Sequence, residues 1–66
     1  MKTLVYQGGT ILGYELEIGE KLRFVTEREE PYMGMTVKLH VLHSMDTHQL
    51  VYVNNKELAE CFEVIA

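Results

Sequence analysis

Apolar and polar side chains alternate most regularly between positions 35 and 41. Apolar side chains occupy the odd positions, from Met35 to Val41, and polar side chains such as Lys38 and His40 lie between them. Successive side chains of a β-strand point to opposite faces of a sheet, so a strand with one buried face alternates in this way. The pattern predicts a long strand whose odd-numbered residues face the core.

The alternation continues into a second strand at residues 48–53. A loop at residues 44–47 would pair His43 with His48 and set Val41 opposite Leu50. The inward face would then hold four apolar or aromatic residues: Leu39, Val41, Leu50 and Tyr52. We therefore predict a β-hairpin here.

An upstream strand is predicted at residues 21–26, with Leu22 and Phe24 facing the core. The register that sets Phe24 against Val37 keeps the apolar residues of both strands on one face. Residues 27–34 are then the connection between the two strands.

Both ends of the chain show local signals. Gly8-Gly9 is typical of a two-residue turn and predicts an N-terminal β-hairpin over residues 1–18. Asn54-Asn55 can cap a short helical turn at about residues 55–60, since an Asn side chain accepts bonds from free N–H groups. A last strand is predicted at residues 61–65.

These elements predict the fold class. Five or six short antiparallel strands with one helical turn before the last are typical of a small closed or nearly closed all-β barrel. At 66 residues, the chain is expected to form a single domain over residues 1–66.

From residue 19 to 65 the order of elements resembles a Src-homology-3-like barrel of the small bacterial and phage-encoded type, including KOW-like domains. The resemblance rests on the strand at 22–26, Pro31-Tyr32-Met33-Gly34 leading into 35–41, the strand at 50–53, the turn at 55–60 and the closing Phe62-Glu63-Val64-Ile65. It implies a non-catalytic binder of protein, peptide or nucleic acid. The N-terminal hairpin is an addition to that pattern.

Charge argues against nucleic acid as the first choice of partner. The chain has six Lys and Arg against ten Asp and Glu, and a formal net charge of −4. Phosphate binding draws on clustered basic side chains. The alternative of a nucleic-acid-binding module rests on Lys21, Arg23 and Lys38, with Arg23 expected opposite Lys38 on an outward face.

The single cysteine bears on the compartment. Cys61 excludes a disulfide within the chain and is expected to be a small buried hydrophobe. A lone thiol fits a reducing compartment. The apolar run before Gln7 is too short for a signal peptide, and no stretch reaches the roughly 20 apolar residues of a membrane span. We expect a cytoplasmic protein.

The charged connection is the first candidate recognition surface. Its residues form either a solvated hairpin tip or an acidic surface for a basic partner. Tyrosine and methionine are enriched at the centres of interfaces, so Tyr32 and Met33 would mark a recognition tip if both are exposed. The alternative is that either side chain folds down and closes the end of the barrel. The candidate protein-binding residues are Glu27, Arg28, Glu29, Glu30, Tyr32 and Met33.

A second candidate surface follows from the alternation itself. If the odd positions of the central hairpin face inward, then Leu42, Val51 and Val53 face outward, although they are apolar. Either the N-terminal hairpin covers them, or they form an interface with another molecule.

Motifs for chemistry are lacking in the sequence. It contains no glycine-rich phosphate loop and no nucleophile elbow, and Cys61 has no cationic neighbour in sequence. His43, His48 and Asp46 would meet at a flexible tip, which is a poor metal site. We expect no catalysis, no cofactor and no metal.

The expected function is a small binding module that acts on another protein. A phage- or prophage-encoded modulator of a host protein is one form of it. A homo-oligomer that sequesters a ligand is a further alternative.

Overall fold

The computed structural model describes residues 2–11 and 13–65. Its elements are β1 (Thr3–Tyr6), β2 (Lys21–Tyr32), β3 (Met35–Ser44), β4 (Leu50–Asn54), α1 (Asn55–Cys61) and β5 (Phe62–Val64). The prediction of an all-β protein with one short helix before the last strand is confirmed.

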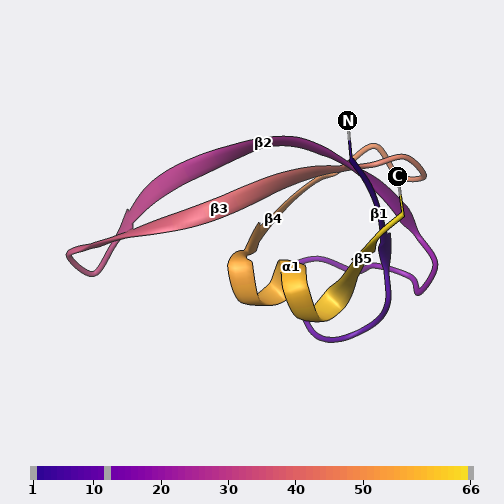
Figure 1. Cartoon of the computed structure of the whole chain (residues 1–66), viewed down its shortest axis with the longest axis horizontal. Helices are drawn as coiled ribbons and strands as arrows, with labels where there is room; N and C mark the ends of the chain where they lie inside the picture. The colour runs from indigo at the N-terminus through magenta and orange to yellow at the C-terminus, as the bar shows by residue number, and fades with distance from the viewer. Residues whose placement is uncertain (1, 12, 66) are drawn as a thin grey trace.

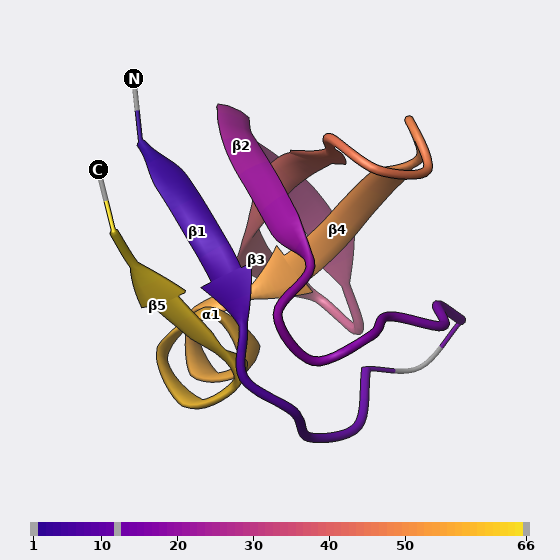
Figure 2. The same cartoon turned by 90° about the vertical axis from the view of Figure 1, so that its right-hand side faces the viewer.

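The five strands form one antiparallel sheet in the order β4-β3-β2-β1-β5. Strands β1 to β4 are neighbours in chain order, and β5 returns to pair with β1. The sheet curls, and α1 lies under it between β4 and β5 (Figure 1 and Figure 2). The result is a small barrel-like fold.

The core lies on the inner face of the curled sheet. Tyr14 and Leu16, from the segment between β1 and β2, and Leu58 from α1 pack against it. Its buried residues are Leu4, Tyr6, Ile11, Leu22, Leu42, Val51, Val53, Cys61 and Phe62. Full burial of an aliphatic or aromatic side chain contributes about 1.5–3 kcal/mol, so this cluster supplies the main stabilisation of the fold.

The predicted orientation of the central hairpin is wrong at most positions, although Val41 is buried, as predicted. Leu42, Val51 and Val53 were expected on the face away from the core, either covered by the N-terminal segment or forming an interface. All three lie in the core and are completely buried, in one cluster with Leu4 and Ile11 of the N-terminal segment. The inner face of β3 also includes His40 and Ser44, which are buried. Because these two residues are polar, the sequence pattern predicted that this face is exposed to solvent. In the structure, the side chain of each has a hydrogen-bond partner within the protein.

The register between β3 and β4 differs from the prediction by two positions. Val41 lies opposite Tyr52 rather than Leu50, and Leu50 lies opposite His43. The cause is the length of the connection, which spans residues 45–49. A shift of two positions leaves each side chain on the face it had.

The register between β2 and β3 is also corrected. Phe24 lies opposite Leu42 instead of Val37, and Val25 forms a bulge between two paired stretches. Residues 27–32 continue β2, so the charged segment predicted as a connection is a strand. As predicted, Leu22 is buried and Phe24 packs against the core.

The far part of the β2–β3 hairpin projects from the sheet. β1 pairs with β2 only as far as Arg23, and β4 pairs with β3 only from Leu39. Residues 26–38 therefore form a two-stranded ribbon, which we call the arm. In Figure 1 it extends to the left, beyond the helix and the other strands.

The described residues of segment 1–18 do not form the predicted hairpin. β1 is a single strand that pairs with both β2 and β5, and the chain from Gln7 to Glu20 contains no further strand among its described residues. A hairpin would give β1 one neighbour, whereas this arrangement gives it two. Apolar residues of the segment, including Ile11 and Leu16, cover the core instead.

The predicted short helix and last strand at the C-terminus are confirmed, except that Cys61 belongs to the helix rather than to the strand. Asn54 is the N-cap of α1, and its side chain accepts a hydrogen bond from the N–H of Glu57 at 2.7 Å. The Glu57 carboxylate accepts one in return from the N–H of Asn54 at 3.0 Å, which completes a capping box. Phe62 then begins β5.

Candidate interaction surface on the arm

The backbone of the arm has two edges that no other strand of the described residues covers. One hydrogen bond of β4 shows which N–H and C=O groups point outward at these edges. The N–H of Tyr52 donates to the hydroxyl of Tyr14 at 3.2 Å, so it points away from β3. Tyr52 lies opposite Val41, whose own N–H and C=O groups therefore point toward β2. Because these directions alternate along a strand, the N–H and C=O groups of Lys38 and Thr36 point away from β2, where β4 no longer reaches.

The free edge of β2 has residues that oppose pairing with a further strand. By the same alternation, the backbone groups of Glu27, Glu29 and Pro31 point outward from this strand. Pro31 has no N–H, so it loses no bond to β3 and offers none to an incoming strand. Proline and charged side chains on an edge oppose strand addition. Recognition by the arm is therefore expected through its faces rather than through this edge.

A tight turn presents two apolar side chains at the end of the arm. Met33 and Gly34 form the turn, with φ of 50° and 79°, as a type I′ hairpin requires. A methionine is an unusual choice for a left-handed position, which glycine, asparagine and aspartate tolerate best. Met33 is 85% exposed, Met35 71% and Tyr32 65%.

One face of the arm combines an ion pair with an apolar row. We call it the outer face, and its residues are Arg28, Glu30, Tyr32, Met35, Val37 and Leu39. Nη2 of Arg28 lies 2.9 Å from Oε1 of Glu30, and the guanidinium lies 6.0 Å from the centre of the Tyr52 ring. Cross-strand partners share a face, so Leu39 lies beside Arg28 and Val37 beside Glu30.

A shallow groove of about 420 Å³ lies over this face. It is lined by Glu30, Pro31, Tyr32, Val37, Leu39 and Asn54. Val37 and Leu39 are half-buried, while the neighbouring Tyr32 is largely exposed. The arm therefore offers both a depression and protruding side chains within one hairpin.

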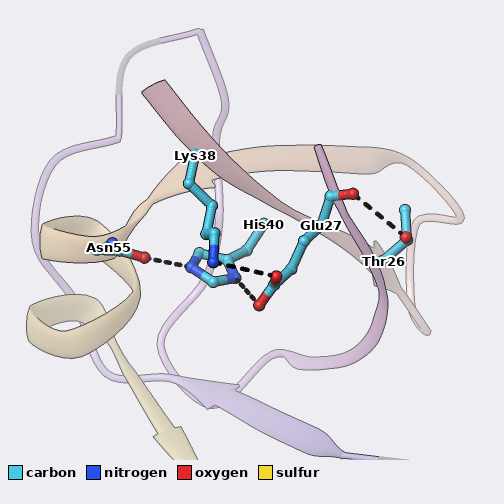
Figure 3. A network of polar contacts seen from close by, with 5 residues as sticks. All are labelled: Thr26, Glu27, Lys38, His40 and Asn55. Carbon is cyan, nitrogen blue, oxygen red and sulfur yellow. Dashed lines mark hydrogen bonds and ion pairs between the residues drawn. The ribbon is translucent and has the colours of Figure 1, made fainter. Parts of the chain in front are cut away.

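The inner face of the arm is tied to the helix by polar contacts (Figure 3). Nε2 of His40 donates to Oδ1 of Asn55 at 2.5 Å, and Nδ1 of His40 lies 3.6 Å from Oε1 of Glu27. Oε2 of Glu27 lies 3.5 Å from Nζ of Lys38. His40 is buried, and its Nδ1 has no hydrogen-bond partner among the described residues. This network fixes the base of the arm against the start of α1.

The first predicted surface is thus placed differently from the expectation. Glu27 and Glu29 lie on the inner face of β2, while Arg28 and Glu30 lie on the outer face. They form no single acidic tip. Met33, with Tyr32 beside it, is at the end of the arm, as the sequence suggested.

The other two predicted surfaces are not assembled. Leu42, Val51 and Val53 are buried and unavailable to a partner. Arg23 lies opposite His43 and Lys38 opposite Glu29, so the predicted pairing of the two cations is wrong.

The rows of the outer face were missed by sequence reasoning. Met35, Val37 and Leu39 had been assigned to the core because they alternate with polar residues. The signal that could have placed them outside was the equally apolar row at positions 42, 51 and 53.

The histidine pair is adjacent, as predicted, despite the altered register. The rings of His43 and His48 lie 5.8 Å apart, and His48 has a φ of 63°. Within the described part of the chain, no group of three or more His, Cys, Asp or Glu side chains is arranged to hold a metal ion. Cys61 is buried and unpaired, and its predicted burial is confirmed.

An acidic depression of about 440 Å³ lies at the other end of the molecule, with Glu15, Glu17, Glu20 and Asp46 among its lining residues. Glu20 is buried there, and its two oxygens accept bonds from Ser44 Oγ at 2.6 Å and from the N–H of Glu17 at 3.2 Å. These bonds give Glu20 a structural role.

No family model, curated protein or solved structure matches the chain. The resemblance to Src-homology-3-like barrels thus stays a prediction, and the functional argument rests on the geometry of the arm. Within residues 2–11 and 13–65, the structure has no helix long and apolar enough to cross a lipid bilayer.

Proposed function

We propose that the protein is a non-catalytic binding module that recognises protein through the outer face and tip of its arm. The observation that supports this most strongly is the arm itself. Residues 26–38 have no third strand beside them and no element of the described chain pairs with either edge. An isolated two-stranded hairpin is at best marginally stable in water, so the arm gains from a surface that covers it.

The chemistry of the exposed side chains favours a protein partner. Tyr32, Met33 and Met35 are the kind of large side chains that are enriched at interface centres and depleted on free surfaces. Arg28 and Glu30 neutralise each other on the same face. A surface with balanced charge and exposed apolar groups is suited to protein rather than to phosphate.

Nucleic-acid binding lacks a comparable observation in its favour. Nζ of Lys38 lies 3.5 Å from Oε2 of Glu27. Arg23 lies opposite His43, which is five positions from Lys38 along β3. The basic residues therefore form no continuous track for a phosphate backbone.

Photo-cross-linking tests the proposal. A photoreactive amino acid replaces Met35 on the arm, or Lys56 on the exposed side of α1 as the control. Irradiation, both of the purified protein and in its native cells, is expected to give protein adducts from position 35 and none from position 56. Equal yields from the two positions, or no adduct from position 35, would contradict it.

The two faces of β2 provide a second control. Glu29→Lys and Glu30→Lys introduce the same charge change on opposite faces of one strand. The proposal expects Glu30→Lys to reduce the adducts at position 35 and Glu29→Lys to leave them unchanged.

A further inference from the structure

We propose that the partner of the outer face is a second copy of this chain, with the two arms packed face to face and antiparallel. This inference rests on the proposed function, because it takes the outer face as the contact surface. It names the occupant and the symmetry of the contact.

The order of residues on the outer face is self-complementary. Three cross-strand pairs follow one another along it: Arg28–Leu39, Glu30–Val37 and Tyr32–Met35. The pair Thr26–Val41 precedes them on the same side of the hairpin, with Val41 buried. A two-fold axis that lies in the contact plane, across the strands, and passes between the Arg28–Leu39 and Glu30–Val37 pairs reverses this order. Arg28 then meets Glu30 of the second copy, and Leu39 meets its Val37. Both contacts occur twice, as a two-fold interface requires.

The charges of Arg28 and Glu30 from the two copies therefore balance one another at the proposed contact. Each guanidinium, already 2.9 Å from the Glu30 carboxylate of its own strand, gains a second carboxylate across the interface. The four groups alternate in sign, and no like charges face each other. A foreign partner would need to supply this alternation separately.

The apolar side chains are also covered in this arrangement. The half-buried Leu39 and Val37 contact each other across the interface, and the exposed Tyr32 and Met35 reach the Thr26–Val41 pair of the second copy. In the antiparallel arrangement, the tip of each arm covers the base of the other. Each arm gains a second layer, which is how a sheet with an apolar face is normally covered. A chain of 66 residues has a small core, and oligomerisation is one of the usual ways to add stability at this size.

Sedimentation velocity of the full chain at low salt tests the inference, over concentrations from about 1 μM to about 1 mM, which brackets weak and moderate self-association. The wild type is expected to pass from monomer to dimer. Arg28→Glu and Glu30→Arg each place like charges together twice in a homodimer and are expected to weaken dimerisation at least about tenfold. Lys56→Glu is the control for charge reversal away from the arm and should leave the dissociation constant unchanged.

Mixing the two variants gives the decisive result. In a heterodimer of Arg28→Glu with Glu30→Arg, every cross-interface contact again joins opposite charges, although the neighbours within each chain still repel. Native mass spectrometry should show the heterodimer in excess over both homodimers. A statistical mixture, or no heterodimer, would overturn the arrangement.

Two other outcomes would also overturn the inference. One is a wild type that stays monomeric at every concentration, and the other is a dimer unaffected by Arg28→Glu. In either case, adducts from position 35 to a different protein would leave the proposed function standing. Absence of all adducts from that position would remove the proposed function as well.

Discussion

Ser44 and Glu20 form a hydrogen bond of 2.6 Å between two buried side chains that lie 24 positions apart. The bond joins the segment before β2 to the last residue of β3, just before the connection to β4. Ser44 Oγ also accepts the backbone N–H groups of Asp46 at 3.3 Å and Thr47 at 3.2 Å. One hydroxyl therefore holds two irregular segments together at the end of the barrel-like fold.

Ser44→Ala is expected to destabilise the protein by about 1–3 kcal/mol, because a buried carboxylate oxygen loses its donor. Urea unfolding followed by circular dichroism measures the change. Glu20→Gln should cost less in the Ser44→Ala background than in the wild type, since the shared bond is already gone. Glu15→Gln, an exposed carboxylate of the same segment, is the control and should stay within about 0.5 kcal/mol. Additive effects at positions 20 and 44 would show that the bond contributes little.

Gly9 is held against the end of α1. A Cβ at this position would lie 2.7 Å from Sγ of Cys61, and the φ of 107° is one that other residues rarely adopt. Gly9→Ala is therefore expected to lower the free energy of unfolding by at least about 1–3 kcal/mol. Gly13→Ala is the matched control, because its φ is 90° but a Cβ there would meet no atom of the described residues beyond its chain neighbours within 4 Å.

The difference between these two variants measures the contact with Cys61. Cys61→Ala should therefore cost less in the Gly9→Ala background than in the wild type. Equal costs for Gly9→Ala and Gly13→Ala would assign the whole effect to the backbone conformation.

The capping box at Asn54 gives a third prediction. Asn54→Ala removes the acceptor for the N–H of Glu57 and is expected to cost about 0.5–2 kcal/mol. Thermal unfolding by circular dichroism measures this loss. Lys56→Ala, on the exposed side of the same turn, should change the stability by less than about 0.5 kcal/mol. A cost for Lys56→Ala equal to that of Asn54→Ala would mean that helix propensity, rather than the cap, sets the stability.

The contrast between the two ends of the chain shows what the sequence can predict. The cap joins residues three apart, so a local pattern at Asn54 was sufficient to place α1 and the following strand. Gly8-Gly9 is an equally local signal, but the predicted hairpin does not form. β1 instead pairs with two strands that are distant in sequence, β2 and β5. Local chemistry predicted an element well only where nothing distant competed with it.

The orientation of β3 failed for a related reason. His40 and Ser44 are buried because Asn55 and Glu20, distant in sequence, supply their hydrogen bonds. A pattern of apolar and polar positions cannot anticipate such partners, so it assigned the apolar outer row to the core. For the same reason, the sequence did not predict the outer face of the arm as a candidate site, because Val37 and Leu39 were assigned to the core. The prediction that one face of this hairpin has surplus apolar residues was right, but it named the wrong face.

Met33 gives the last prediction, which separates folding from recognition. Its φ of 50° is a left-handed conformation that costs an ordinary residue roughly 1–2 kcal/mol, whereas Asn-Gly is a preferred pair for this turn. Met33→Asn is therefore expected to stabilise the protein, by up to about 1 kcal/mol, in urea unfolding. The same change removes an exposed apolar side chain from the tip and should reduce cross-linking from position 35.

Tyr32→Thr is the control for Met33→Asn. It removes an exposed aromatic side chain from a strand position, so it should weaken cross-linking from position 35 without the gain in stability. Opposite signs for stability and contact in Met33→Asn would mean that the methionine is retained for binding at the expense of the turn, as is common at functional sites. If Met33→Asn raises stability and leaves the adducts unchanged, the tip has no part in recognition, and the contact surface is confined to the groove and the Arg28–Glu30 pair.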